Sequence, residues 1–164
     1  MDGAPTSLAD LGYNHVGIDD CWQDCLSPQS MNGSYHTATG DPIIDVSRFP
    51  DLKGLATAAK AKGVTLGWYG NNCPETRGVG RGPEFCGEKG LLLSDWPAAL
   101  HGDVKTLRDI GFGSVKLDGC GAGSDMQAYY DLVNPSGTSD PVVIENCHCQ
   151  HLGSLATPHV EPVT

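Results

Sequence analysis

The stretch VKTLRDIGFGSVKLD, residues 104–118, decides the fold. Its first part has apolar residues at helical spacing, and its last part is a short apolar strand. Side chains alternate between the two faces of a strand, so Lys116 and Asp118 point one way while Val115 and Leu117 point the other. Two charges on one face of an apolar strand are costly to bury unless they are paired or take part in chemistry. They mark either a structural ion pair or a functional site.

The same unit occurs three times along the chain. A helix, a glycine and a short apolar strand recur at residues 7–20, 55–69 and 104–118. The glycines stand where a helix ends in a left-handed residue; they are Gly12, Gly63 and Gly111. The second and third helices carry apolar stripes at i, i+3, i+4 and i+7 spacing, formed by Leu52, Leu55, Ala56 and Ala59 and by Trp96, Leu100, Val104 and Leu107.

A fourth strand, at residues 141–146, follows a predicted helix near 125–133. Helices and strands alternate with no two-residue hairpin turn between strands, which predicts an α/β fold built from parallel β/α units. The segments after the strands, 21–49 and 70–94, are long and rich in Gly, Pro, Asn and Ser. Such loops at the carboxyl ends of parallel strands hold the sites of α/β proteins. We expect a site formed there by Asp19, Asp20, Tyr69, Lys116, Asp118, Glu145 and Asn146.

Charge and hydropathy limit the partners. Ten basic and twenty acidic side chains give the 164 residues a formal net charge of −10, which argues against nucleic acid and against an anionic membrane surface. No apolar run approaches the length of a transmembrane helix. The opening MDGAPTSLAD lacks the basic and apolar regions of a signal peptide. Either the protein is cytosolic, or this chain begins inside a longer one.

Seven cysteines bear on the compartment. This density favours disulfides and an oxidising environment, and the odd number leaves at least one thiol unpaired or paired outside the chain. The disulfide candidates are Cys21, Cys25, Cys73, Cys86, Cys120 and Cys147. A zinc site is the competing interpretation, because CHCQH brings together Cys147, His148, Cys149 and His151. These ligands lack the two-residue spacer of common zinc knuckles, so disulfides are favoured and no metal is expected.

The expected site lacks the signatures of nucleotide binding and of serine hydrolases. The chain has no GxGxxG after a strand, no P-loop and no GxSxG elbow. What remains is carboxylates, one lysine, one tyrosine and the tryptophans Trp22 and Trp68, whose faces could stack on sugar rings. A glycosidase needs one carboxylate to attack or to activate water and a second to protonate the leaving oxygen. Lys116 beside Asp118 would keep that carboxylate ionised and nucleophilic.

Four motifs carry a resemblance to a known family. GYNHVGIDDCWQ, GWYGNNC and GSVKLDGCG, together with GDPIIDVSRFPDLKGLATAAKAKGVTLGWY, resemble in order the strand motifs of the glycoside hydrolase family 27 α-galactosidases, or melibiases. The resemblance implies a TIM (β/α)8 barrel, a fold of about 250 residues. Residues 1–164 would then be a fragment of one catalytic barrel domain with roughly strands two to five, lacking the first strand and the C-terminal half. We expect this fragment to be inactive on its own.

The resemblance also implies roles for individual residues. Asp118 matches the family's catalytic nucleophile, which forms a covalent glycosyl-enzyme with net retention, and Lys116 matches a residue that contacts the sugar hydroxyls. Asp19 and Asp20 match the pair that binds the hydroxyls distinguishing galactose, and Tyr69 matches a tyrosine that lines the sugar. The acid/base carboxylate would lie outside this chain.

Cys120 matches a partner in a disulfide that braces the nucleophile loop, and its mate would be Cys86 or Cys73. The expected partner is a galactose-containing saccharide, with no cofactor. The complete protein is expected to be secreted, lysosomal or vacuolar. The chain departs from the family at Cys147, which is followed by His148 where the family often has Glu-Trp. Selection between galactose and its 2-acetamido relative therefore stays open.

Three other functions remain. The protein could be a family relative that acts on α-N-acetylgalactosaminides or β-L-arabinopyranosides. It could be a galactose-binding module or pseudoenzyme without catalysis. It could also be a cytosolic metal-binding protein that uses its Cys and His residues.

Overall fold

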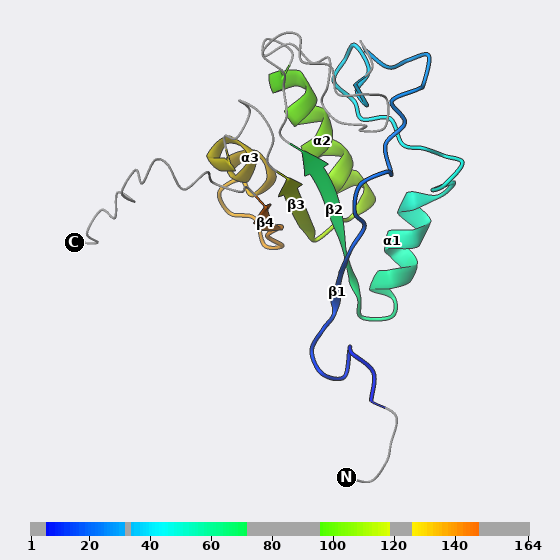
Figure 1. The fold of residues 1–164 in the computed structure, drawn as a ribbon. Coiled ribbons are helices and arrows are strands. Elements are labelled where there is room, and N and C mark those ends of the chain that lie inside the picture. Colours follow the sequence, from blue (N-terminus) through cyan, green and yellow to red (C-terminus); the bar gives the residue numbers. More distant parts are fainter. Residues whose placement is uncertain (1–5, 32–33, 72–95, 119–125, 148–164) are drawn as a thin grey trace, which may run out of the picture.

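The described part of the chain consists of a parallel sheet with helices packed on one side. The computed structural model describes residues 6–31, 34–71, 96–118 and 126–147. Among these residues the sheet has the order β1-β2-β3-β4, and every neighbouring pair is parallel (Figure 1). The elements in chain order are β1 (His15–Gly17), α1 (Leu52–Lys60), β2 (Thr65–Asn71), α2 (Trp96–Ile110), β3 (Ser114–Asp118), α3 (Met126–Val133) and β4 (Val143–Cys147). The predicted α/β fold of parallel β/α units is confirmed.

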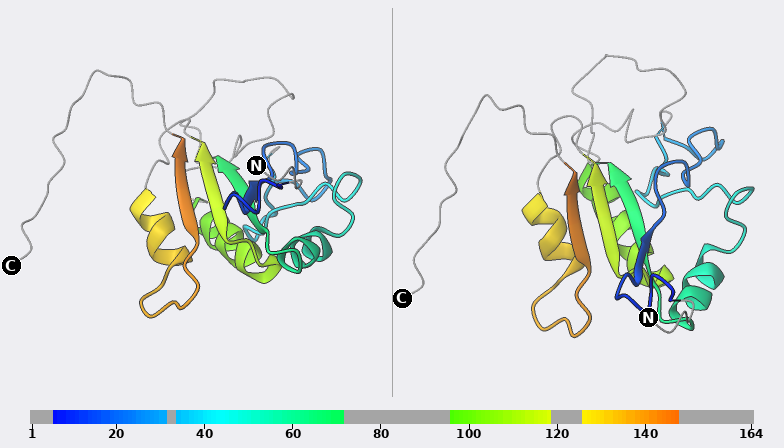
Figure 2. Two further views of the ribbon diagram at one scale, coloured as in Figure 1. Left: turned by 90° about the horizontal axis from the view of Figure 1, so that it is seen from below. Right: turned by 60° about the horizontal axis from the view of Figure 1, so that its bottom comes forward.

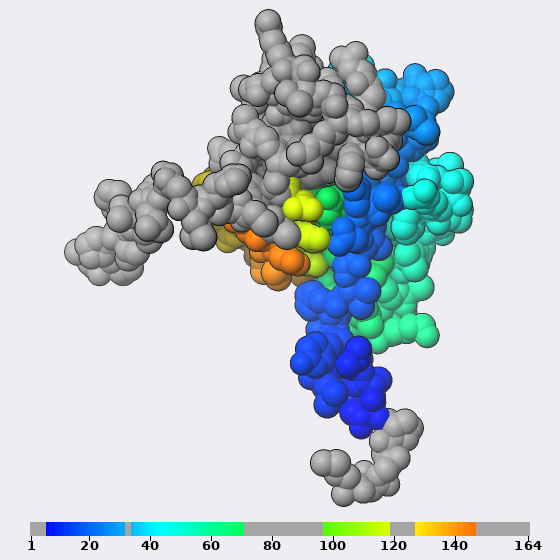
Figure 3. All heavy atoms as spheres, in the orientation of Figure 1, coloured from blue at the N-terminus to red at the C-terminus, as the bar shows by residue number. Residues whose placement is uncertain are grey.

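The three described helices lie on one side of the sheet (Figure 2). On that side Trp68, Val115 and Leu117 are buried. On the other face Lys116 and Asp118 are only partly buried, as strand alternation predicts. Atoms of β3 and β4, yellow-green and orange, reach the surface in Figure 3, so no helix covers them there. Among the described residues, one face of the sheet thus packs on helices, and the other has no helix over it; we call it the open face.

Local sequence explains why α1 begins and ends where it does. The Asp51 side chain caps the helix by accepting a hydrogen bond from the Gly54 amide at 2.8 Å. Leu52 and Ala56, one turn apart, are the buried positions of the predicted stripe. After the helix the chain reverses at Gly63, whose φ of +73° is in the left-handed region that glycine adopts without a steric cost.

The predicted helix at the start of the chain is wrong. Residues 6–12 form turns, in which the amides of Leu11 and Gly12 donate to the carbonyls of Leu8 and Ala9. Leu8 and Leu11 are exposed, so no apolar face is buried here. A segment this short does not hold a helix without such packing.

The loop between β1 and α1 packs directly on α2. A Cβ atom at Gly102 would overlap the carbonyl of Gly40, so glycine is required for this close approach. Next to Gly102 on the helix, Asp103 contacts the loop residues Tyr35 and His36. None of the described helices is both long and apolar enough to span a membrane.

Candidate active site

Four of the residues predicted for the site lie together at the carboxyl ends of the strands. Tyr69 on β2 pairs in register with Lys116 on β3, and Asp19 lies just beyond β1. The Tyr69 hydroxyl donates to Asp118 Oδ2 at 3.2 Å, and Lys116 Nζ donates to Asp19 Oδ2 at 3.0 Å. The same ammonium lies 5.4 Å from the centre of the Tyr69 ring, within range of a cation–π attraction. The cluster therefore joins side chains from three neighbouring strand ends.

Lys116 forms its ion pair with Asp19. Lys116 and Asp118 do share a face, but they are about 7 Å apart along the strand. The long lysine side chain crosses over the Tyr69 ring and pairs with Asp19. The hydrogen bond to Asp118 comes instead from the Tyr69 phenol. The expectation that Lys116 keeps the Asp118 carboxylate ionised stays a prediction.

The second aspartate of the pair has a local role in this structure. Asp20 Oδ1 accepts a hydrogen bond from the Cys21 amide at 2.7 Å, and its side chain is half-buried. Cys21 has a φ of +73°, a strained value for a residue with a side chain. This turn directs the chain away from β1 and into the core. Among the described residues, Asp20 is linked to the cluster of Asp19, Lys116, Tyr69 and Asp118 through its backbone amide, which donates to Asp19 Oδ1 at 2.8 Å, and its side chain makes no contact found with that cluster.

The expectation that Trp22 and Trp68 stack on a sugar is wrong. Both side chains are buried, with exposed fractions of 0% and 1%, and their ring centroids are 3.9 Å apart. Trp68 faces the helices because strand alternation places it with Val115 rather than with Lys116. Trp22 reaches the core through the turn at Cys21. These rings are core, and the aromatic ring in the site belongs to Tyr69.

The structure shows the bonding state of only some of the cysteines. Cys25 is disulfide-bonded. Cys21, a disulfide candidate from the sequence, is instead a free, exposed thiol. Cys73, Cys86 and Cys120 lie outside the described residues, as does the side chain of Cys147. Within the described parts of the chain, no three His, Cys, Asp or Glu side chains form a group that could hold a metal.

The pKa of the Asp19 carboxyl is below its ordinary range. The main cause is the hydrogen bond from the Asp20 amide at 2.8 Å, and the second is the one from Lys116 Nζ. Because folding lowers this pKa, the stability it contributes is complete above the unfolded pKa and is lost as the pH falls through the folded value. The Asp19–Lys116 pair is therefore intact in mildly acidic solution.

We expect Asp19→Asn to lower the free energy of unfolding by the same small amount at pH 7 and at pH 5. The amount is small because the Asp19 side chain is 69% exposed and its pair is screened by solvent. The difference from the wild type shrinks only below about pH 4, where carboxyls protonate. Urea unfolding of both proteins across this range measures it. A difference that already disappears between pH 7 and pH 5 would contradict the assigned hydrogen bonds.

The described residues thus form a parallel β/α sheet with carboxylates at the carboxyl ends of its strands. No protein-family model matches the chain. The chain is 30% identical over 153 residues to the Talaromyces emersonii protein named "Probable alpha-galactosidase B", a match that covers 91% of this chain and 28% of that protein. It is 28% identical over 141 residues to an alpha-N-acetylgalactosaminidase of Gallus gallus, covering 84% of this chain and 30% of the relative.

A solved structure gives the same result for the fold. The Saccharomyces cerevisiae α-galactosidase solved with raffinose matches with a TM-score of 0.60 and 19% identity, over 87% of this chain and 28% of that one. The chain is a homologue of the α-galactosidases of glycoside hydrolase family 27, and its fold is part of their TIM barrel. It spans less than a third of the length of the curated relatives it matches.

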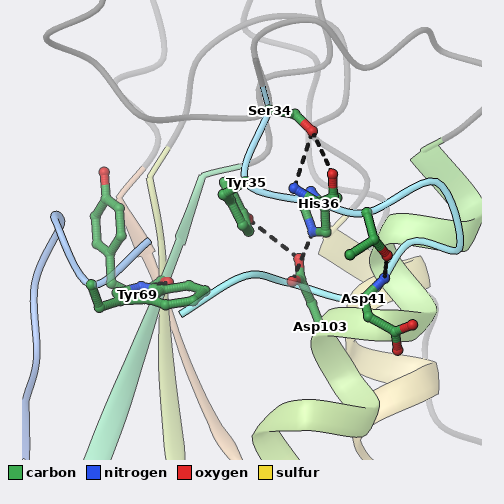
Figure 4. Close-up of polar contacts among 8 residues, drawn as sticks. Ser34, Tyr35, His36, Asp41, Tyr69 and Asp103 are labelled. Atoms are coloured by element: carbon green, nitrogen blue, oxygen red, sulfur yellow. Dashed lines mark hydrogen bonds and ion pairs between the residues drawn. The ribbon is translucent and has the colours of Figure 1, made fainter. Parts of the chain in front are cut away.

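Two features of the site were missed by the sequence reasoning. One is the hydrogen bond from the Trp22 indole to the Tyr69 carbonyl at 2.9 Å. The other is a buried contact of Tyr35 and His36 with Asp103 (Figure 4). For the hydrogen bond of Trp22, the available signal was a tryptophan soon after the first strand. The sequence does not show, however, which way the tryptophan ring turns. The second joins residues 67 and 68 positions apart, which no local pattern indicates.

Proposed function

We propose that this chain carries the nucleophile of a retaining α-galactosidase, with Asp118 as that nucleophile. The observation that carries the proposal is the hydrogen bond from the Tyr69 hydroxyl to Asp118 Oδ2 at 3.2 Å. It fixes a carboxylate at the carboxyl end of a parallel strand, on the open face of the sheet, where barrel enzymes keep their catalytic groups. The homology to α-galactosidases supplies the reaction class.

In the proposed reaction Asp118 attacks the anomeric carbon of a terminal galactose. Tyr69 holds Oδ2, so Oδ1 is the oxygen that forms the new bond. The bond from the anomeric carbon to the leaving oxygen breaks, and that oxygen takes a proton from a carboxylic acid outside the described residues. Water then attacks the same carbon, the ester to Asp118 breaks, and the water proton returns to the acid/base group. Two inversions give net retention of configuration.

The charged neighbours would bind the sugar. Lys116 Nζ and the Asp19 carboxylate form a donor and acceptor pair at 3.0 Å, matched to hydroxyl groups that both donate and accept. We assign them to the galactose hydroxyls, with Asp20 as a further acceptor. Tyr69 would line the sugar with its hydroxyl end, because its ring is largely buried.

We further propose that the sheet corresponds to strands two to five of one barrel domain. The helices on one side and the open polar face on the other support this arrangement (Figure 2). The disulfide of Cys25 supports an oxidising location, secreted, lysosomal or vacuolar. A second candidate substrate is an α-N-acetylgalactosaminide, favoured by the likeness to the Gallus gallus enzyme.

The test compares nitrophenyl α-galactoside, α-N-acetylgalactosaminide and β-L-arabinopyranoside as substrates of the protein expressed from the longest reading frame that contains these residues. We expect the α-galactoside to have the highest kcat/KM. NMR of the first product should show the α-anomer of galactose. Preference for the acetamido sugar would support the second candidate. Galactose binding without turnover would identify a sugar-binding module and contradict the proposal.

A further inference from the structure

We propose that Trp22 is a positioning residue, which holds Tyr69 and through it Asp118 in the geometry of attack. The inference rests on the proposed function, because it concerns the group that we assign as nucleophile. The contact that carries it is the hydrogen bond from Trp22 Nε1 to the Tyr69 carbonyl oxygen at 2.9 Å. Both residues are buried, so water does not compete for this bond.

The backbone hydrogen bonds between β1 and β2 show why this bond is needed. The Ile18 amide donates to the Gly67 carbonyl at 3.0 Å, at the end of the pairing between β1 and β2. Carbonyls two residues apart on a strand point to the same edge, so the Tyr69 carbonyl also faces the β1 side. The Asp20 amide, which is the next β1-side donor after Ile18, donates to Asp19 Oδ1 instead, and the chain then turns away at Cys21. The Trp22 indole therefore takes the place of the missing backbone donor.

The indole is itself held firmly. Its ring contacts Trp68 at a centroid distance of 3.9 Å and meets the Tyr35 ring edge-on at 5.4 Å. The Tyr35 hydroxyl lies 3.4 Å from Asp103 Oδ2 on α2, within weak hydrogen-bonding range, as Figure 4 shows. A buried path thus runs from helix α2 through Tyr35 and Trp22 to Tyr69, and the Tyr69 hydroxyl bonds Asp118.

Loss of the indole N–H would remove the 2.9 Å hydrogen bond that the buried Tyr69 carbonyl accepts at the end of β2. Losing a hydrogen bond to a buried carbonyl is costly, and the strand end would shift. The Tyr69 phenol moves with its backbone, and Asp118 loses the hydrogen bond that orients it. A displacement of about 1 Å at a reacting group can lower a rate a hundredfold.

The chain offers a matched control. Trp68 is also a buried tryptophan of the same ring stack, but its Nε1 has no hydrogen-bond partner among the residues that the structure describes. Trp22→Phe and Trp68→Phe remove the same atoms from neighbouring buried sites. Only the first removes a hydrogen bond to the strand that carries Tyr69.

The experiment uses the complete protein, with both variants assayed on nitrophenyl α-galactoside and followed by hydrogen–deuterium exchange of the peptide covering residues 65–71. We expect kcat of Trp22→Phe to fall at least about tenfold below that of Trp68→Phe, with KM changed less. The peptide should exchange faster in Trp22→Phe. A global packing defect would affect both variants alike.

Equal kcat values and equal exchange in the two variants would overturn the proposal. If the wild-type protein cleaves none of the glycosides, the proposed function fails by that result alone. The exchange comparison does not depend on turnover, and it then decides whether Trp22 holds the end of β2.

Discussion

Replacing Asp118 by asparagine is expected to lower kcat on an activated α-galactoside by about 10⁴-fold or more. An amide has nearly the shape of the carboxylate and can still accept the hydrogen bond of Tyr69, so the fold is kept. It lacks the negative charge that attacks the anomeric carbon, and no glycosyl ester forms. In other enzymes, a variant that lacks the catalytic nucleophile keeps only the rate acceleration that substrate binding and the remaining catalytic groups provide.

Two further variants test whether the loss of kcat is specific to the Asp118 carboxylate. Asp140→Asn changes an exposed aspartate just before β4 and should leave kcat unchanged. In Asp118→Gly the space of the carboxylate is free, so added azide should attack the anomeric carbon from that side. The product would be β-galactosyl azide, of inverted configuration. Turnover of Asp118→Asn near the wild-type level would exclude Asp118 as the nucleophile.

The second large effect concerns stability. Asp103→Ala is expected to lower the free energy of unfolding by about 1–3 kcal/mol, because it removes the carboxylate that the buried His36 ring nitrogen contacts. Asp103 Oδ1 is 3.0 Å from His36 Nε2, and its other oxygen is 3.4 Å from the Tyr35 hydroxyl. His36 is fully buried, so its ring nitrogen would find no water in place of the carboxylate.

Urea unfolding of the complete protein measures this loss, and the same helix provides the control. Asp109 on α2 is exposed and pairs with Lys105 one turn away at 2.8 Å. Asp109→Ala removes a carboxylate from the same helix, yet it should change stability little, since an exposed pair is screened by solvent. Equal losses of unfolding free energy in the two variants would contradict the prediction that the buried contact of Asp103 contributes more to stability than the exposed pair of Asp109.

The fold could be predicted from the sequence because its signals are local. Glycines after helical stripes mark the chain reversals, and Gly63 and Gly111 do have φ values of +73° and +94°. Strand alternation placed Lys116 and Asp118 on the open face and Val115 among buried residues. The failure at residues 6–12 has the same origin, since a helical pattern does not form a helix where its apolar residues remain exposed.

The contacts within the site depend on geometry that the sequence does not contain. Lys116 and Asp19 are 97 positions apart, so their pairing follows from the order of the strands and from the reach of a lysine. The direction of Trp22 depends on one left-handed residue, Cys21. A strand end with an aromatic residue looks the same in sequence whether the ring faces the site or the core.

Covalent trapping tests most directly whether these side chains form a glycosidase site. The complete protein is incubated with a fluorinated α-galactosyl fluoride, whose glycosyl-enzyme hydrolyses slowly, and then digested for mass spectrometry. The account predicts one fluorogalactosyl group, attached to the Asp118 carboxylate and absent from Asp118→Asn. A label on another residue, or catalysed turnover of the reagent without any covalent intermediate, would contradict it.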